Sequence, residues 1–393
     1  MTKANRWLLP DGVDEILPPQ ANQLESLRRE ILDLYSTWGY ELVMTPLIEF
    51  LDSLLILPSN ELQLQTFKIV DQLTGRGMGV RADITSQVAR IDSHVLQRDV
   101  PTRLCYADSV LHTLPKSLLG SRSPLMIGAE LYGHSGIESD IEVISLMLHT
   151  LGKAGIVEPQ LALGHVGIYR ALTSEANLSP ILEEKLFAAL QRKSAGEIEQ
   201  VLRDGQADEA LITNIRNLST LHGDISVLDR AASEITCKLP QVAESIEQLR
   251  QIADGIQATF PEQSLYFDLG ELRGYEYHTG VVFAAYVSSF GEAIANGGRY
   301  DDIGEVFGRA RAATGFDADL KVLLAQSMKA RPEPKRIFAP ADNDPALASA
   351  VSDLRAQGQQ VVCAFAGQAE SAEDMGCNHV LVKSGDSWQV NPL

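Results

Sequence analysis

The sequence has few cysteines, no long apolar run and no excess of positive charge. Its 393 residues include four cysteines, none in a CxxC pair, which argues against a zinc site built on clustered cysteines. Scattered cysteines of this kind are typical of small buried side chains in a reducing compartment. The N-terminal stretch contains acids and a proline in place of an apolar segment. We therefore expect no signal peptide, no transmembrane segment and a cytoplasmic location.

The balance of charge is strongly acidic, with a formal net charge of −19 at pH 7. A protein that grips tRNA must neutralise phosphates, so this charge favours a chain with no nucleic-acid partner, although simple solubility explains it equally well. The length predicts two or three domains, and a composition of 45% hydrophobic and 22% charged residues is typical of a globular protein with a large core.

The most informative stretch runs from residue 265 to residue 324. Within it, residues 273–280 read RGYEYHTG and form a polar cluster between apolar runs. Residues 296–301 read NGGRYD and place charge and an aromatic ring beside paired glycines, where the backbone can turn sharply or approach a ligand closely. We expect the first motif on or near a hairpin, and Arg299 and Tyr300 on the following turn. Together such groups can bind one small zwitterion.

Both motifs resemble the histidine-recognition signatures of histidyl-tRNA synthetase, a class II aminoacyl-tRNA synthetase, and the resemblance extends to the N-terminus. The pattern is more similar to a non-catalytic relative, the regulatory subunit of ATP phosphoribosyltransferase, which acts in histidine biosynthesis. The resemblance implies an α+β fold with a class II synthetase-like, mostly antiparallel sheet flanked by helices. It places the core in residues 1–177 and 261–330, a helical insertion in 178–260, and a small C-terminal α/β module in 335–393.

Local patterns agree with this layout. Apolar residues at helical spacing predict a helix from about Ala21 to Trp38, followed by a strand, Tyr40 to Thr45. This unit resembles motif 1, which forms the dimer interface of class II synthetases. Residues 178–260 show helical patterns that no strand-like run interrupts. Further predicted elements are a hairpin of Phe67–Asp71 with Met78–Arg81, tail strands at 336–339, 360–365 and 379–383, and a tail helix at 345–357.

The resemblance also assigns residues to a histidine site. Asp83 and Thr85 match the carboxylate and threonine that hold the α-amino group of histidine in the synthetase. Both residue types also cap helices, and the two roles can coexist. Glu130 would accept from an imidazole N–H and Arg273 would contact the carboxylate. The predicted histidine-binding residues are Asp83, Thr85, Glu130, Arg273, Tyr277 and His278.

Two positions of this predicted site depart from the synthetase pattern. Met126 stands where a glutamine is expected, which removes one polar contact. His278 replaces the final tyrosine of a Tyr-Tyr pair, and we expect it to make the site sensitive to pH. A lone glutamate between apolar residues is usually paired within the structure, and Arg273 or Tyr277 is the partner that we consider for Glu130.

The residues that bind ATP in the synthetase are replaced. By resemblance, His112 stands in place of the arginine that clamps the α-phosphate, and Val322, preceded by Lys321, in place of the arginine at the γ-phosphate. Neither a mostly neutral imidazole nor a point charge supplies the bidentate fork of arginine. Asp317 and Asp319 would also bring like charges near a triphosphate. We therefore expect no synthetase activity, no catalytic residue, no cofactor and no metal.

The function that these features favour is implied by the resemblance. It is a non-catalytic regulatory subunit that activates a short-form ATP phosphoribosyltransferase catalytic subunit and mediates its feedback inhibition by histidine. Self-association as a dimer within a hetero-oligomer is expected, without a nucleic-acid or membrane partner. Three alternatives stay open: a divergent histidyl-tRNA synthetase, a free-standing histidine sensor, and a degenerate core with an empty pocket.

Overall fold

The structure is a computed structural model that describes residues 7–56, 60–115, 120–176, 178–235, 239–275, 277–331 and 334–393. Glu276 of the RGYEYHTG motif and Cys237 lie outside the described residues. The chain divides into two compact units, Met1–Lys329 and Ala330–Leu393. Within the described ranges, no helix has the length and apolar character needed to cross a bilayer.

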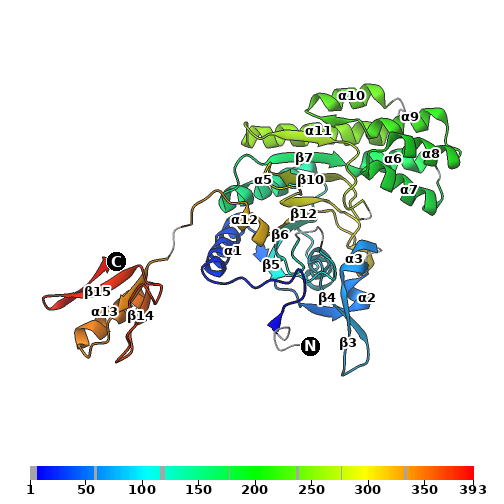
Figure 1. The fold of residues 1–393 in the computed structure, drawn as a ribbon. Coiled ribbons are helices and arrows are strands. Elements are labelled where there is room, and N and C mark those ends of the chain that lie inside the picture. The colour runs from blue at the N-terminus through cyan, green and yellow to red at the C-terminus, as the bar shows by residue number, and fades with distance from the viewer. Residues whose placement is uncertain are drawn as a thin grey trace. The chain divides into compact units, whose positions relative to one another are not determined.

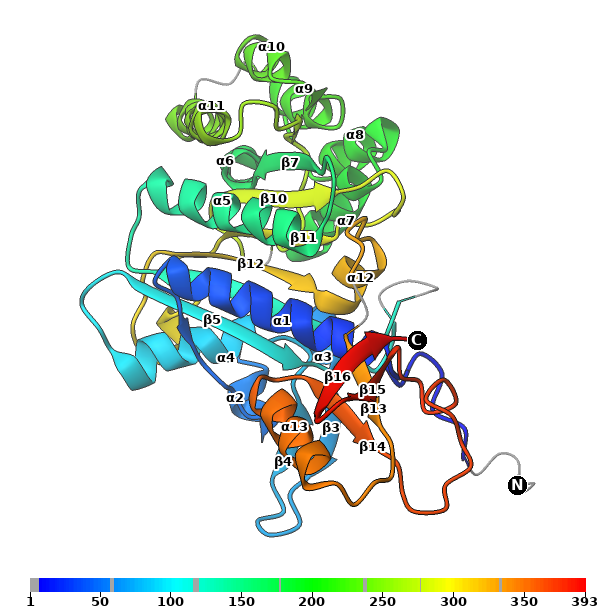
Figure 2. The same cartoon turned by 90° about the vertical axis from the view of Figure 1, so that its left-hand side faces the viewer.

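A nine-stranded, mostly antiparallel sheet organises the first unit (Figures 1 and 2). The strand order is β1-β5-β6-β12-β11-β10-β7-β9-β8, in which β1·β5 and β7·β9 are parallel pairs. The strands are β1 (Glu41–Leu42), β5 (Thr102–Ser109), β6 (Leu125–Tyr132), β7 (Gln160–His165), β8 (His222–Gly223), β9 (Leu265–Asp268), β10 (Val281–Tyr286), β11 (Ala295–Arg299) and β12 (Ala313–Asp319). A small sheet, β2-β4-β3, contains β2 (Ile48–Phe50), β3 (Phe67–Val70) and β4 (Gly77–Val80). This architecture confirms the predicted fold class.

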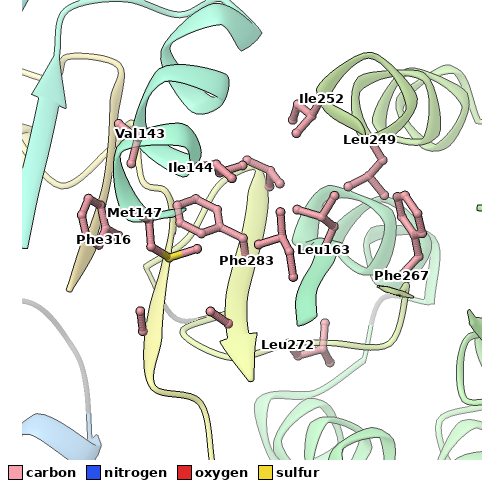
Figure 3. Close-up of a cluster of buried hydrophobic side chains, with 14 of the residues drawn as sticks. Val143, Ile144, Met147, Leu163, Leu249, Ile252, Phe267, Leu272, Phe283 and Phe316 are labelled. Carbon is pink, nitrogen blue, oxygen red and sulfur yellow. The ribbon is translucent and has the colours of Figure 1, made fainter. Parts of the chain in front are cut away.

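Long helices pack against the large sheet and bury its core. In α1 (Gln20–Thr37), the buried residues recur at helical spacing, so one apolar face meets the sheet. The two other long helices are α5 (Ile137–Ala154) and α11 (Pro240–Thr259). Figure 3 shows part of the core between α5, α11 and the strands, where the labelled side chains are Val143, Ile144, Met147, Leu163, Leu249, Ile252, Phe267, Leu272, Phe283 and Phe316.

The remaining helices of this unit are shorter. They are α2 (Leu51–Leu54), α3 (Asn60–Gln65), α4 (Thr85–Arg90) with a π-helical continuation (Ile91–Leu96), α6 (Val166–Ala176), α7 (Pro180–Gln191), α8 (Ala195–Asp204), α9 (Glu209–Leu218), α10 (Ser226–Glu234), a 3-10 turn (Glu305–Phe307) and α12 (Leu320–Ala325). The prediction that no strand interrupts residues 178–260 is wrong. The two-residue strand β8 pairs antiparallel with β9, and two residues are too few to produce a periodic pattern.

Two further expectations about residues 265–324 are corrected. The RGYEYHTG motif lies on the connection from β9 to β10, but these strands form no hairpin, because β7 lies between them in the sheet. The NGGRYD motif forms most of β11 instead of a turn, and Tyr300 follows that strand. Its paired glycines serve close approach: a Cβ on Gly297 would lie 2.1 Å from the carbonyl oxygen of Gly315 on β12.

The C-terminal unit is a small α/β module. Its sheet has the order β14-β13-β15-β16 and packs against one helix around Ile337, Val351 and Leu381. The elements are β13 (Arg336–Ala339), α13 (Pro345–Ala356), β14 (Gln360–Cys363), β15 (His379–Ser384) and β16 (Ser387–Pro392). The predicted tail strands and helix are present, and β16 was not predicted. It follows a tight turn at Gly385, whose φ of +63° is left-handed.

Candidate functional site

A cavity of about 1370 Å³ lies against the large sheet in the first unit. Its walls come from strands β6, β7 and β9 to β12, from the β4–α4 junction, and from the 269–280 connection. All six residues predicted to bind histidine line this cavity, together with Met126 and His112. Parts of the chain that are far apart in sequence therefore converge on one hollow.

Asp83 and Thr85 stand where β4 passes into α4. Oδ1 of Asp83 accepts hydrogen bonds from the backbone N–H groups of Ile84 at 2.8 Å and Thr85 at 3.3 Å, where the chain enters α4. The hydroxyl of Thr85 lies 3.3 Å from Oδ1 of Asp83 and 3.3 Å from Oε1 of Glu130. The N-cap residue of α4 is Ile84, which has no side-chain cap hydrogen bond, so this pair lines the cavity without occupying the capping position.

Glu130 lies on β6 and is 1% exposed. The hydroxyl of Tyr300 donates to its Oε2, and the hydroxyl of Tyr106 donates to Oε1 at 3.3 Å. The expectation that Arg273 or Tyr277 pairs with Glu130 is therefore wrong, because its tyrosine hydrogen-bond partners are Tyr106 on β5 and Tyr300 just after β11.

Burial, together with the nearby charges of Asp83 and Asp317, raises the pKa of Glu130 to about 8 against the lowering effect of the Tyr300 hydroxyl. The carboxyl is thus mostly protonated at neutral pH. It fills the space above Gly315 on β12, where a Cβ would lie 1.5 Å from Oε2. A glycine at this position is what lets the glutamate enter the cavity wall.

Arg273 and Tyr277 stand at the rim of the cavity. Nη2 of Arg273 donates to the hydroxyl of Tyr286 at 2.9 Å and lies 3.6 Å from a carboxylate oxygen of Glu271. The side chain of Arg273 is 43% exposed and Tyr277 is 39% exposed. The turn depends on Gly274, whose φ of +64° is left-handed and whose carbonyl accepts the N–H groups of residues 277 and 278. A cation and a phenol are thereby presented to an entering anion.

His278 is buried, and its Nδ1 donates to the carbonyl of Arg273 at 3.0 Å. In the neutral ring, Nε2 is consequently an acceptor. It lies close to Gly298: a Cβ added to that glycine would be 2.8 Å from Nε2. Burial lowers the pKa of His278 to about 4. The expectation that His278 gives the site its sensitivity to pH is therefore wrong at neutral pH, where Glu130 is the group that titrates.

Around His112 and Lys321, which the resemblance predicts to lie near ATP positions, the described lining residues present no exposed fork of cations. Nε2 of His112 donates to the carbonyl of Ala82 at 2.9 Å, in a buried position. Lys321 forms an ion pair with Asp14 at 3.1 Å, and Val322 packs against the core. Asp319 adds a carboxylate that caps α12 by accepting from the backbone N–H of Lys321 at 2.9 Å. The side chains present here are poorly suited to a triphosphate.

The side chains of Arg299 and Tyr300 in NGGRYD lie in different places. Arg299 is buried and pairs with Asp140 at 2.8 Å and Asp301 at 3.1 Å, so it is structural and does not line this cavity. Tyr300 faces the cavity, and the alternation of side chains along a strand could have predicted this difference. Tyr106 was missed because an aromatic residue in an apolar strand is usually a core residue.

Comparison with known proteins places this fold. A family model described as histidyl-tRNA synthetase matches residues 12–323. The solved structure of histidyl-tRNA synthetase from Nostoc sp. PCC 7120 is similar, with a TM-score of 0.77, 17% identity and coverage of 96% of this chain and 91% of that chain. The fold therefore defines a protein of the histidyl-tRNA synthetase-like class.

The more specific matches lie within that class. Residues 334–391 match a family model described as the C-terminal domain of the ATP phosphoribosyltransferase subunit HisZ. Proteins named ATP phosphoribosyltransferase regulatory subunit are 52% identical in Thioalkalivibrio sulfidiphilus, over 100% of both chains, and 50% identical in Alkalilimnicola ehrlichii, over 100% of this chain and 98% of that one. A solved Bacillus halodurans protein titled ATP phosphoribosyltransferase regulatory subunit/histidyl-tRNA synthetase has a TM-score of 0.83 at 25% identity, covering 96% of this chain and 97% of that one. This chain belongs to the family of ATP phosphoribosyltransferase regulatory subunits.

Proposed function

We propose that this chain joins a short-form ATP phosphoribosyltransferase catalytic subunit in the cytoplasm, activates it, and confers feedback inhibition by histidine. The observation that carries the proposal is the convergence of the six predicted residues on one cavity. In this proposal Asp83 and Thr85 hold the ammonium group of histidine and Arg273 holds the carboxylate. Glu130 and His278 then face the imidazole ring, with Tyr277 at the rim.

The chemistry of these groups is complementary to histidine. A carboxyl oxygen of Glu130 can accept an imidazole N–H even while the group carries its proton, and neutral His278, whose Nδ1 donates to the carbonyl of Arg273, offers Nε2 as an acceptor. A ligand without a ring N–H donor would leave Nε2 of His278 without this partner, which is costly for a buried acceptor. For regulation, histidine must also bind the active and inhibited assemblies with different affinity, because equal binding shifts no equilibrium.

We infer that the phosphoribosyl chemistry lies wholly on the partner. Support comes from His112, which is tied to the Ala82 carbonyl, and from Lys321, which is neutralised by Asp14. Neither provides a free bidentate cation for binding a polyphosphate group. We infer too that residues 178–260 are an insertion into a core of 1–177 and 261–330, since all three ranges lie within one compact unit up to Lys329.

We further propose that the chain self-associates as a dimer through the motif 1 region. Support comes from a run of exposed apolar side chains on and after β1: Leu42 is 45% exposed, Met44 75%, Leu47 46% and Ile48 43%. Several exposed apolar side chains along one segment, here called the apolar strip, are typical of a protein interface, and pairing about a two-fold axis would bury the same strip on both copies.

The test is reconstitution with the purified short-form catalytic subunit. The phosphoribosyltransferase rate is measured with and without this chain, then across a histidine titration. For Arg273→Ala and Glu130→Ala we expect activation to be kept and inhibition to be weakened at least tenfold, equivalent to ~1.4 kcal/mol. Arg250→Ala, which removes an ion pair with Asp229 on the insertion, is the matched control. Absence of activation by wild type contradicts the regulatory role, and unaltered inhibition of both cavity variants places the histidine site elsewhere.

A further inference from the structure

The connection from β9 to β10, residues 269–280, carries three of the predicted ligand residues, and the helical segment 178–260 clamps its entry. The backbone N–H of Leu269 donates to the carbonyl of Leu221 at 3.0 Å. Beside it, Nζ of Lys193 lies 2.6 Å from a carboxylate oxygen of Asp268. Both partners, Leu221 and Lys193, belong to the helical segment, so the connection begins from a point that this segment fixes.

Tyr275 anchors the middle of the connection to two helices away from the cavity. Its hydroxyl donates to Oε1 of Glu183 on α7 at 2.6 Å. Its ring packs edge-on against Tyr169 of α6, with centroids 5.1 Å apart, and beside Phe187 of α7 at 5.5 Å. Its carbonyl accepts from Nη2 of Arg170 at 2.9 Å. Burial raises the pKa of Tyr275 to about 12, so the hydroxyl keeps the proton that it donates.

The ligand residues are close neighbours of this anchor. Arg273 lies just before Tyr275 in the chain, and Tyr277 and His278 lie just after it. The bond from His278 Nδ1 to the Arg273 carbonyl spans Tyr275, so the turn holds these groups together. A shift of the Tyr275 side chain is consequently passed to groups on both sides, since so few backbone torsions lie between them.

We propose that Tyr275 and Glu183 are positioning residues of the histidine site. Their hydrogen bond holds the 269–280 connection in its ligand-binding geometry, so the helical segment sets histidine affinity without touching the ligand. The inference rests on the function proposed above and deepens it. A partner that displaces α7 changes histidine affinity, and histidine changes the affinity for that partner by the same factor.

The experiment compares Tyr275→Phe, Glu183→Ala, Glu183→Gln and the Tyr275→Phe/Glu183→Ala double variant in the full chain. Histidine binding is measured by calorimetry, and backbone order in residues 269–280 by hydrogen exchange without ligand. We expect Tyr275→Phe and Glu183→Ala each to weaken binding about fivefold, the size expected from one hydrogen bond. Exchange should rise in 269–280 and stay constant in α5. The double variant should be no worse than either single one, because both remove the same bond.

Glu183→Gln should restore binding and exchange to near wild type, because its amide oxygen accepts the same hydroxyl. Tyr40→Phe is the matched control, since it removes a tyrosine–glutamate bond, to Glu142 at 3.1 Å, away from the cavity. The inference is overturned if exchange in 269–280 is unchanged in the variants, or if Tyr40→Phe weakens binding equally. If wild type binds no histidine, the proposed function fails, while the exchange measurement still decides whether the anchor orders the connection.

Discussion

The hydroxyl of Tyr300 donates a hydrogen bond to Oε2 of Glu130 across 170 positions of sequence. This bond joins the second recognition motif to a strand that comes early in the chain, within a fully buried cluster that also contains Tyr106 and Tyr132. A carboxyl held only by phenols and a threonine is costly to ionise, because no cation contacts it among these partners. Several properties of the protein depend on this one group.

The first prediction concerns stability against pH. The pKa of Glu130 is about 8 when folded and near the ordinary glutamate value when unfolded, so the folded state binds the extra proton between these values. This group therefore stabilises the fold at low pH and loses that contribution as pH rises through about 8, by at most ~1.4 kcal/mol per pH unit. Glu130→Gln should flatten the dependence. Urea unfolding at about pH 6 and pH 8.5 measures it, and parallel curves for the two proteins would contradict the prediction.

The second prediction concerns Gly315. An added Cβ would lie 1.5 Å from Oε2 of Glu130 and 3.0 Å from the Ala129 carbonyl, so Gly315→Ala must displace a side chain that Tyr300 holds. We expect a loss of ~1–3 kcal/mol of unfolding free energy, together with weaker histidine binding. Gly152→Ala is the control: it lies in α5 with open space around it and should stabilise by up to ~1 kcal/mol. Equal stability of the two variants in urea would rule out the crowding argument.

The third prediction is that the chain does not activate histidine. By the resemblance, His112 and Val322 stand in place of two phosphate clamps; each clamp is commonly worth ~3 kcal/mol, so losing both should cost several orders of magnitude in rate. Histidine-dependent ATP–pyrophosphate exchange, run beside an authentic histidyl-tRNA synthetase, is the measurement. Exchange at a rate comparable with that of the authentic enzyme would contradict this prediction and indicate that the chain is a synthetase.

The fourth prediction concerns self-association. Met44→Lys places a charge in the apolar strip and should shift the chain from dimer to monomer, because an unpaired charge in an interface is costly to desolvate. Met328→Lys makes the same change at a residue that is 79% exposed outside this strip, and it should leave the assembly intact. Light scattering at micromolar concentration decides between them, and a wild-type monomer, alone and with the catalytic partner, would refute the dimer.

Much of the fold was predictable from local sequence. The helix ending near Trp38 and the hairpin of β3 and β4 follow from periodicity and from a glycine-rich turn, both of which are short-range signals. The order of strands in the large sheet was not predictable in this way. The placement of β7 between β9 and β10 depends on contacts between distant segments, and a local pattern favours pairing neighbours instead.

The site, like the fold, was predictable where local motifs mark its residues and was missed where contacts between distant segments decide. The six residues carried over from recognition motifs do line one cavity, although their binding role stays a prediction. The groups that tune them were missed: Tyr106 looks like a core aromatic, and Tyr275 looks like part of the ligand motif. The neutral state of His278 follows from its burial, which a sequence does not reveal.

Both edges of the nine-stranded sheet are formed by strands of two residues, β1 and β8. Edge strands this short offer few unpaired backbone groups with which a strand of another chain could form hydrogen bonds. The helical segment 178–260 supplies β8, which pairs with two residues of β9 and so covers part of its edge. Chains that lose β8 through truncation of this segment should accordingly be more prone to form fibrils or amorphous deposits, even where the remaining core is sound.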